Sequence, residues 1–212
     1  MQATRIIAVR HGETAWNVDT RLQGHLDIPL NDIGIWQAER LANALADEPI
    51  ETVYASDLMR AWQTAQAIAR VSHCPLRPDP GLRERGFGEF EGHTYAEIEA
   101  IWPDLSLQWR KRAPHWAPPG GESLIMMRQR VQATVDALAV RHVGAQIVLV
   151  AHGGVMDMLY RMATGQELQA PRTWLLSNAA INRLLWTPEG LTLVGWADSS
   201  HLDRASLDES NT

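Results

Sequence analysis

The sequence predicts an α/β fold with a mostly parallel central sheet, helices on both faces, and a partly helical insertion over the C-terminal sheet edge. Short apolar runs, typical of strands buried on both faces, alternate along the chain with segments of helical period. Two of these runs, 6–9 and 147–151, are each followed closely by a histidine and a glycine. Ligands of open α/β sheets bind at the carboxyl ends of the strands, so both histidines are expected at a binding site.

The first half of the chain is expected to supply two strands and two helices. A strand covers about 5–10, and a helix begins near Asn31 or Asp32, both good capping residues. Residues 52–55 form a second strand, and Ser56 is expected to cap the next helix. The inward-facing residues are Ile35, Ala38, Ala42 and Leu45 in the first helix, and Leu58, Ala61, Ala65 and Ile68 in the second.

The rest of the chain begins with the irregular segment 71–121, which contains seven prolines and is expected to be the insertion. A long helix begins near Ser123 and leads into the second histidine-ending strand, which a further helix follows. Two final strands, 181–186 and 191–196, flank a hairpin turn at 187–190. The inward-facing residues of the two helices are Leu124, Met127, Val131, Val135 and Leu138, then Val155, Leu159 and Met162.

Length and composition fit one domain at 1–198 and a loose polar tail at 199–212. The formal net charge of -6 opposes a general attraction to nucleic acid or anionic membranes. No apolar run approaches the roughly 18 residues of a membrane span, and the N-terminus has no signal-peptide pattern. The single cysteine, Cys74, suits a reducing compartment. We expect a cytoplasmic protein with a small-molecule partner, and a homodimer stays open.

His11 is the first candidate for catalysis. A neutral imidazole can attack phosphorus and form a phosphohistidine, which divides one difficult displacement into two easier ones. The neighbouring Arg10 carries a permanently charged fork that matches phosphate geometry, and Gly12 lets the backbone approach a ligand closely. A lone histidine at a strand end is more often hydrogen-bonded within the core, but the arginine and glycine beside it favour a phosphate site.

A second histidine and a second arginine are expected at the same edge. His152 precedes Gly153 and Gly154 at a helix start, where free N–H groups attract anions. Arg60 lies in the first turn of the helix that follows the second strand. Alone, His152 could be a core histidine and Arg60 a solvated arginine, but the two together with Arg10 and His11 favour phosphate binding. A metal site is disfavoured, since the arginines would repel a divalent cation and no cluster of aspartates or cysteines completes a ligand set.

A proton donor is needed to expel an alkoxide. The segment 81–92 holds three carboxylates among glycines and aromatic residues, namely Glu84, Glu89 and Glu91. All three have the required residue type, and their spacing does not choose among them.

Taken together, these motifs resemble the signature of the histidine phosphatase superfamily, and most closely its phosphoglycerate mutase-like branch. The motifs are Val9-Arg10-His11-Gly12-Glu13-Thr14 with Asn17, Leu22-Gln23-Gly24, Ala55-Ser56-Asp57-Leu58-Met59-Arg60-Ala61, Leu82-Arg83-Glu84 with Phe87-Gly88-Glu89-Phe90-Glu91-Gly92, and Ala151-His152-Gly153-Gly154. They follow the family order, and the resemblance covers nearly the whole chain up to about Trp196.

The resemblance implies the roles of the individual residues. His11 would be the nucleophile that becomes phosphorylated, and Glu84 would be the proton donor. The phosphoryl oxygens would be held by Arg10, Arg60 and His152, which stabilise charge in the transition state. The phosphate pocket would also contain Asn17, Gln23, Gly24 and Gly153. No metal or other cofactor is implied, because arginines and histidines supply the positive charge that Mg²⁺ supplies elsewhere.

The branch contains both phosphatases and mutases, which share the first half-reaction. A phosphatase is favoured because Gly86-Phe87-Gly88 stands where similar mutases carry His-Tyr-Gly, and because the segments 89–92 and 119–123 are more like phosphatases. The basic run 109–112 resembles the patch with which mutases hold a second anion, so a bisphosphoglycerate-dependent mutase stays open. A non-catalytic phospholigand-binding protein is disfavoured, since the full set of catalytic candidates is present.

The insertion also contains Trp102, Trp109 and Trp116. They either pack the insertion onto the domain or form an apolar wall for an aromatic or extended leaving group. Phosphosugars, phosphoglycerates, nucleoside monophosphates and cofactor-precursor phosphates all stay open as substrates.

Overall fold

A computed structural model describes residues 3–203 of the chain. Within these residues, one six-stranded sheet has the order β3-β2-β4-β1-β5-β6. Strands β1 to β4 are mutually parallel, whereas β5 pairs antiparallel with both β1 and β6. The strands are β1 (Thr4–Arg10), β2 (Thr52–Ala55), β3 (Leu76–Pro78), β4 (Gln146–Ala151), β5 (Ile181–Thr187) and β6 (Gly190–Asp198). The predicted mostly parallel sheet is therefore confirmed.

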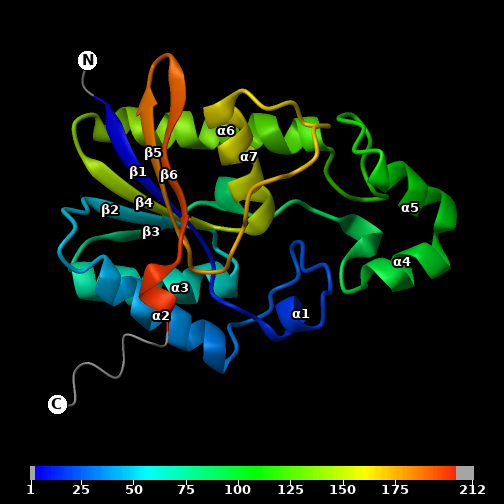
Figure 1. Ribbon diagram of the computed structural model, residues 1–212, viewed down its shortest axis with the longest axis horizontal. Helices are drawn as coiled ribbons and strands as arrows, with labels where there is room; N and C mark the ends of the chain where they lie inside the picture. The colour runs from blue at the N-terminus through cyan, green and yellow to red at the C-terminus, as the bar shows by residue number, and fades with distance from the viewer. Residues whose placement is uncertain (1–2, 204–212) are drawn as a thin grey trace.

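Helices cover both faces of the sheet (Figure 1). Helices α2 (Asp32–Ala44) and α3 (Met59–Ser72) lie on one face, and α6 (Leu124–Ala139) and α7 (Gly153–Thr164) on the other. The remaining helices are α1 (Ala15–Val18), α4 (Tyr95–Ile101) and α5 (Pro103–Arg110), with 3-10 turns at η1 (Pro80–Leu82), η2 (Gly88–Phe90), η3 (Val140–His142) and η4 (Ser200–Leu202). No helix in the described part of the chain has the length and apolar character that a membrane crossing needs.

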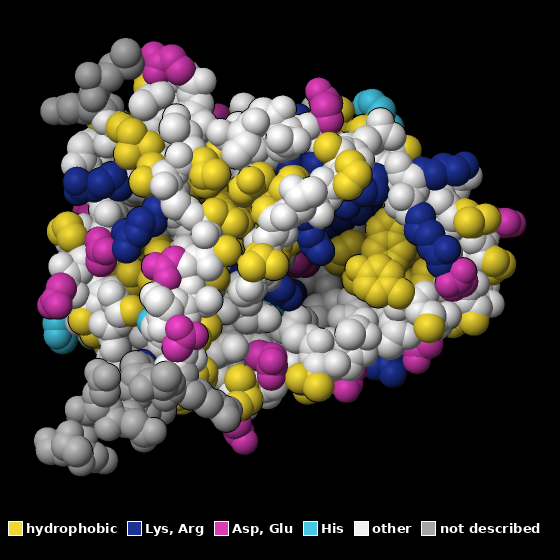
Figure 2. Space-filling view, in the orientation of Figure 1, with side chains coloured by type: hydrophobic (Ala, Val, Ile, Leu, Met, Phe, Trp, Pro, Cys, Tyr) yellow, Lys and Arg dark blue, Asp and Glu magenta, His cyan; other side chains and the backbone are white. Residues whose placement is uncertain are grey.

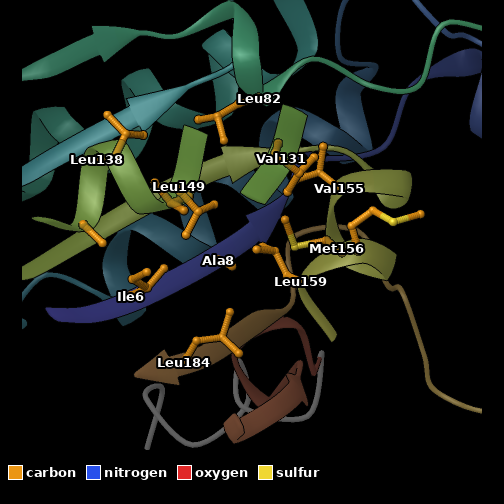
Figure 3. Close-up of a cluster of buried hydrophobic side chains, with 14 of the residues drawn as sticks. Ile6, Ala8, Leu82, Val131, Leu138, Leu149, Val155, Met156, Leu159 and Leu184 are labelled. Atoms are coloured by element: carbon orange, nitrogen blue, oxygen red, sulfur yellow. The ribbon is translucent and has the colours of Figure 1, made fainter. Parts of the chain in front are cut away.

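Alternating side chains of the central strands supply two hydrophobic cores. Ile6 and Ala8 of β1 face α6 and α7, and their neighbours Ile7 and Val9 face α2 and α3. Figure 3 shows the first core, in which Leu149 of β4 lies among side chains from the two covering helices. Burial on both faces explains why these strands are continuously apolar in sequence.

Several predicted elements are confirmed closely. The second strand has the predicted bounds, Asn31 caps α2, and Ser123 caps α6 through its side chain. The expected inward residues of α3 and α6 are buried, and Met162 of α7 is partly buried against the same core as α6.

Two predictions on the α2 and α3 region are wrong. Ile35 is 49% exposed, because the buried face of α2 consists of Gly34, Ala38, Leu41 and Ala42. Ile35 lies at the margin of that face, beside a groove between α2 and α3. Ser56 does not cap α3, whose N-cap is Leu58 and makes no side-chain cap hydrogen bond.

The insertion is shorter than predicted. Helix α3 continues to Ser72, and β3 then pairs parallel with β2 at the edge of the sheet. The prolines of this segment argued against a strand in the sequence. An edge strand tolerates Pro78, however, because its outer side needs no backbone donor. The segment that leaves the sheet, which we call the insertion from here on, is therefore 79–121, and it carries α4 and α5.

The predicted tail starts with an ordered turn. Residues 200–202 form η4, and Arg40 of α2 donates from Nε to the carbonyl of His201 at 2.9 Å. The ring of His201 is hydrogen-bonded in turn to the carbonyl of Ala179 at 3.0 Å. The rest of the predicted tail, from 204 onward, lies outside the described residues.

Candidate active site

The carboxyl ends of β1, β2 and β4 meet at one edge of the sheet, where the structure contains a cavity of about 760 Å³. The space-filling view shows it as a hollow bordered by arginines and a group of apolar side chains (Figure 2). Eight of the predicted site residues line the cavity, namely Arg10, His11, Asn17, Gln23, Gly24, Arg60, Glu84 and Gly153. His152 lies directly behind His11, with the two ring centroids 5.2 Å apart.

His11 is held as a neutral imidazole. Its side chain follows β1 and is 2% exposed, and Nδ1 lies 2.7 Å from the carbonyl oxygen of Gly12. A carbonyl only accepts, so Nδ1 carries the proton and donates it, and Nε2 keeps its lone pair. Burial, with the charges of Arg60 and Arg10, lowers the pKa of His11 well below 6.5. The result is an unprotonated ring nitrogen at neutral pH, which is the state that nucleophilic attack requires.

His152 is fixed through both ring nitrogens. Nδ1 accepts from Nε of Arg60 at 3.2 Å, so Nε2 carries the proton and donates to Oγ of Ser56 at 2.8 Å. Burial, followed by the charge of Arg60, lowers the pKa of His152 well below 6.5. The hydroxyl of Ser56, wrongly predicted to cap a helix, therefore orients a candidate catalytic histidine.

Both arginines line the cavity, with Arg60 buried and Arg10 partly exposed. Arg60 is 1% exposed and donates to the carbonyls of Gly24 and Leu26 at 2.8 and 2.9 Å. Burial lowers the pKa of Arg60 to about 10, which keeps the group charged at neutral pH. Arg10 donates to the carbonyl of Leu176 at 2.5 Å, while its buried Nε has no partner among the described residues. An oxygen of a bound anion would satisfy this donor.

Geometry separates the three candidate acids. Both carboxylate oxygens of Glu84 accept from the N–H of Gly154, at 3.1 and 3.0 Å, in the first turn of α7. Glu89 is exposed, and Glu91 organises a loop by accepting from the backbone N–H groups of His25 and Phe87. Only Glu84 of the three lines the cavity, so it is the candidate acid that the structure brings to the site.

Smaller groups complete a set of donors around the phosphate site. The amide oxygen of Asn17 accepts from the N–H and the hydroxyl of Thr14, which leaves its NH₂ group to donate to an anion. Gly153 is the first residue of α7, and helix N-termini favour anions. A Cβ at Gly24 would overlap the carboxylate of Glu91, which explains the glycine there.

The rest of the cavity lining was predicted only in part. Further lining residues are Arg21, Arg85, Tyr95, Arg112, Asp157 and Arg172. Three residues of the basic run 109–112 line the cavity, namely Trp109, Arg110 and Arg112. Arg110 forms an ion pair with Glu99 at 2.5 Å. Helical spacing could have identified Asp157, because it follows Gly153 by four residues and residues four apart share one face of a helix. Arg172 gives no such signal, since it lies in the loop between α7 and β5.

The three tryptophans of the insertion take the predicted packing role, and the role of an apolar wall stays a prediction. Trp102, Trp109 and Trp116 all pack against Phe90, with ring centroids 5.4–6.4 Å apart, and hold the insertion together. Of the three, Trp109 also lines the cavity. Residues 3–203 contain no group of three His, Cys, Asp or Glu side chains placed to hold a metal ion. The absence of a cofactor stays a prediction.

The fold and the residues gathered at this edge of the sheet are those of the histidine phosphatase class of enzymes. The chain belongs to the histidine phosphatase superfamily (branch 1), whose model matches residues 6–199. It is 37% identical over 206 residues to phosphoglycerate mutase-like protein 4 of Arabidopsis thaliana, covering 95% of this chain and 88% of the relative. It is also 35% identical to the metal-independent phosphoserine phosphatase of the same plant, covering 95% of this chain and 84% of the relative.

A solved structure of a mycobacterial glucosyl-3-phosphoglycerate phosphatase in complex with VO₃ superposes on this chain with a TM-score of 0.81. The two share 32% identity, over 92% of this chain and 99% of that one. The predicted superfamily and fold are thus confirmed, and the chain is an enzyme of the histidine phosphatase kind.

Gly154→Ala should lower activity without unfolding the chain. A Cβ there would overlap Oε1 of Glu84 and lie 2.9 Å from the methyl group of Met127, so the carboxylate must move. We expect kcat for alkyl phosphates to fall about tenfold or more, with an unchanged or higher Tm, since alanine favours a helix. Gly195→Ala, where a Cβ would meet open space, is the matched control. An unchanged kcat in Gly154→Ala would contradict this role of the glycine.

Stability should fall on acidification below about pH 6.5. In the folded chain the pKa of His11 and of His152 is lowered, so below that pH the unfolded chain binds protons that the folded chain does not. Each histidine contributes about 1.4 kcal/mol per pH unit until the pH reaches its folded pKa. Urea unfolding at pH 5, 6 and 7 would measure the slope. His11→Gln should have a visibly shallower slope, and the same slope in both proteins would refute the buried neutral state.

Proposed function

We propose that the chain is a metal-independent phosphomonoesterase that acts on small phosphorylated metabolites through a phosphohistidine on His11. The state of His11 carries the proposal: its Nδ1 proton is held by Gly12, and Nε2 is free beside two guanidinium groups. Relatives named as phosphatases support hydrolysis as the reaction.

Binding of the substrate phosphate would use the donors already described. Arg10 supplies its unpaired Nε, and Arg60 supplies charge from a position fixed by two carbonyls. The N–H of Gly153 and the NH₂ of Asn17 add neutral donors. These groups concentrate positive potential where the phosphoryl oxygens carry the most charge in the transition state.

Transfer would then proceed in two steps. Nε2 of His11 attacks phosphorus in line, the ester P–O bond breaks, and Glu84 gives its proton to the leaving oxygen. The phosphohistidine keeps its Nδ1 proton on the carbonyl of Gly12. Glu84 next takes a proton from a water molecule, which attacks phosphorus and breaks the P–N bond. Inorganic phosphate leaves, and His11 and Glu84 return to their starting states.

A mutase that depends on 2,3-bisphosphoglycerate is the second candidate, favoured by the arginines at the far end of the cavity and by relatives with mutase names. A phosphorus NMR time course in EDTA separates the two activities. The tube holds the protein, 3-phosphoglycerate and a trace of 2,3-bisphosphoglycerate. Accumulation of free phosphate supports the phosphatase, whereas 2-phosphoglycerate without phosphate would establish the mutase. We also propose a cytoplasmic location and leave a homodimer open.

His11→Ala should abolish the phosphoenzyme. Brief mixing with a labelled phosphate monoester should give an acid-labile, alkali-stable phosphoprotein in the wild type and none in the variant. His73→Asn serves as the control, because His73 ends α3, opposite the end that holds Arg60. Acid-labile label that persists in His11→Ala would remove His11 as the nucleophile.

Glu84→Gln should slow hydrolysis most for poor leaving groups. An amide cannot give up a proton to an alkoxide, so kcat for alkyl phosphates should fall by about 10²–10⁴. p-Nitrophenyl phosphate should lose much less, because p-nitrophenolate leaves without protonation. Steady-state assays on the two substrates test the difference, and equal losses would argue against Glu84 as the acid.

A further inference from the structure

We propose that Asp157 selects the leaving group, accepting a hydrogen bond from one of its hydroxyl groups, and that the substrate is accordingly the phosphate ester of a polyhydroxylated compound such as a sugar. This inference rests on the proposed phosphatase function and names the substrate class of the same cavity.

Asp157 lies where a leaving group would extend. It shares the cavity-lining face of α7 with Gly153 and Gly154. Four residues of helix place it about 6 Å along the axis from Gly153, and therefore beyond the phosphate site. Arg112 of the insertion contacts Asp157 and lines the cavity beside it.

The two oxygens of the Asp157 carboxylate differ. Oδ2 accepts from Nε of Arg161 at 3.0 Å and from the guanidinium of Arg112 at 3.4 Å. Oδ1 is buried and has no hydrogen-bond partner among residues 3–203. The side chain as a whole is 8% exposed. A buried carboxylate oxygen without a donor is costly, so a donor on the bound substrate is the partner it lacks.

The surrounding charge decides which donor fits. Burial lowers the pKa of Arg112. The charge of Asp157 raises this pKa, and the charge of Arg161 lowers it further. Burial and the charge of Arg112 lower the pKa of Arg85 to about 10. This end of the cavity therefore has an excess of guanidinium charge, which repels an ammonium group. A neutral hydroxyl can donate to Oδ1 without that repulsion.

The aromatic lining of the cavity suits a sugar. Tyr95 and Trp109 line the cavity as a stacked pair, with centroids 4.9 Å apart and planes 10° from parallel. Figure 2 shows a group of apolar side chains inside the hollow. Such rings pack well against the C–H faces of a polyol chain or sugar ring. Arg112 and Asp157 together offer a donor beside an acceptor, as adjacent hydroxyl groups require.

Three esters with the same six-carbon chain test the idea: sorbitol 6-phosphate, n-hexyl phosphate and 6-aminohexyl phosphate. Asp157→Ala should lower kcat/KM for sorbitol 6-phosphate about tenfold or more, since a buried hydrogen bond is lost. The values for n-hexyl phosphate and p-nitrophenyl phosphate should stay within about twofold, because neither leaving group donates. Equal losses on all substrates, or a larger loss on 6-aminohexyl phosphate, would overturn the proposal.

Two further variants separate recognition from positioning. If Asp157 only holds Arg112, then Asp157→Ala should have no added effect in an Arg112→Ala background; a direct contact predicts that the loss on sorbitol 6-phosphate persists there. Should Asp157→Ala fold poorly because Arg161 is left unpaired, the double variant Asp157→Leu with Arg161→Met removes both charges and must show the same substrate-selective loss. Wild-type hydrolysis of p-nitrophenyl phosphate tests the phosphatase function independently, so the two proposals can fail separately.

Discussion

The buried guanidinium of Arg60 is the interaction on which the rest of the site depends. Its Nε fixes the tautomer of His152, and its two NH₂ groups hold the carbonyls of Gly24 and Leu26. One side chain from α3 thus joins the end of β4 to the loop that closes the phosphate pocket. Its charge also helps to keep His11 unprotonated. The charge of Arg60 therefore contributes both to the neutral state of His11 and to the positive potential of the cavity.

This arrangement destabilises the folded chain when no anion is bound. Two arginines and two neutral histidines lie together in a buried volume, and burial lowers the pKa of each. The carboxylate of Glu84 compensates part of the charge on both arginines. Its own position comes from the start of α7, whose N–H groups face the same cavity. A phosphate dianion would complete the compensation, so affinity for the anion follows from a site built before the anion arrives.

The sequence predicted best what depends on local order along the chain. His11 and His152 follow buried strands, so the parallel sheet alone brings them to one edge. Ser56 was misjudged, because its partner lies 96 residues away and no local pattern records that contact. Likewise, spacing could not choose Glu84, since the choice depends on the N–H of Gly154 from a distant helix. Strand β3 was missed because its prolines are tolerated only at a sheet edge, which is a property of the assembled sheet.

Chemistry and selectivity come from different parts of this fold. Strand ends and helix starts supply the phosphate site, and their positions are set by the two cores of the sheet. The insertion, with its own small core around Phe90, supplies the aromatic wall and Arg112. Asp157 joins the two parts, because it stands on α7 of the main domain and contacts Arg112 of the insertion. In the proposed mechanism, changes in the insertion can therefore alter which alcohol leaves without disturbing His11, provided that the contact between Asp157 and Arg112 is kept.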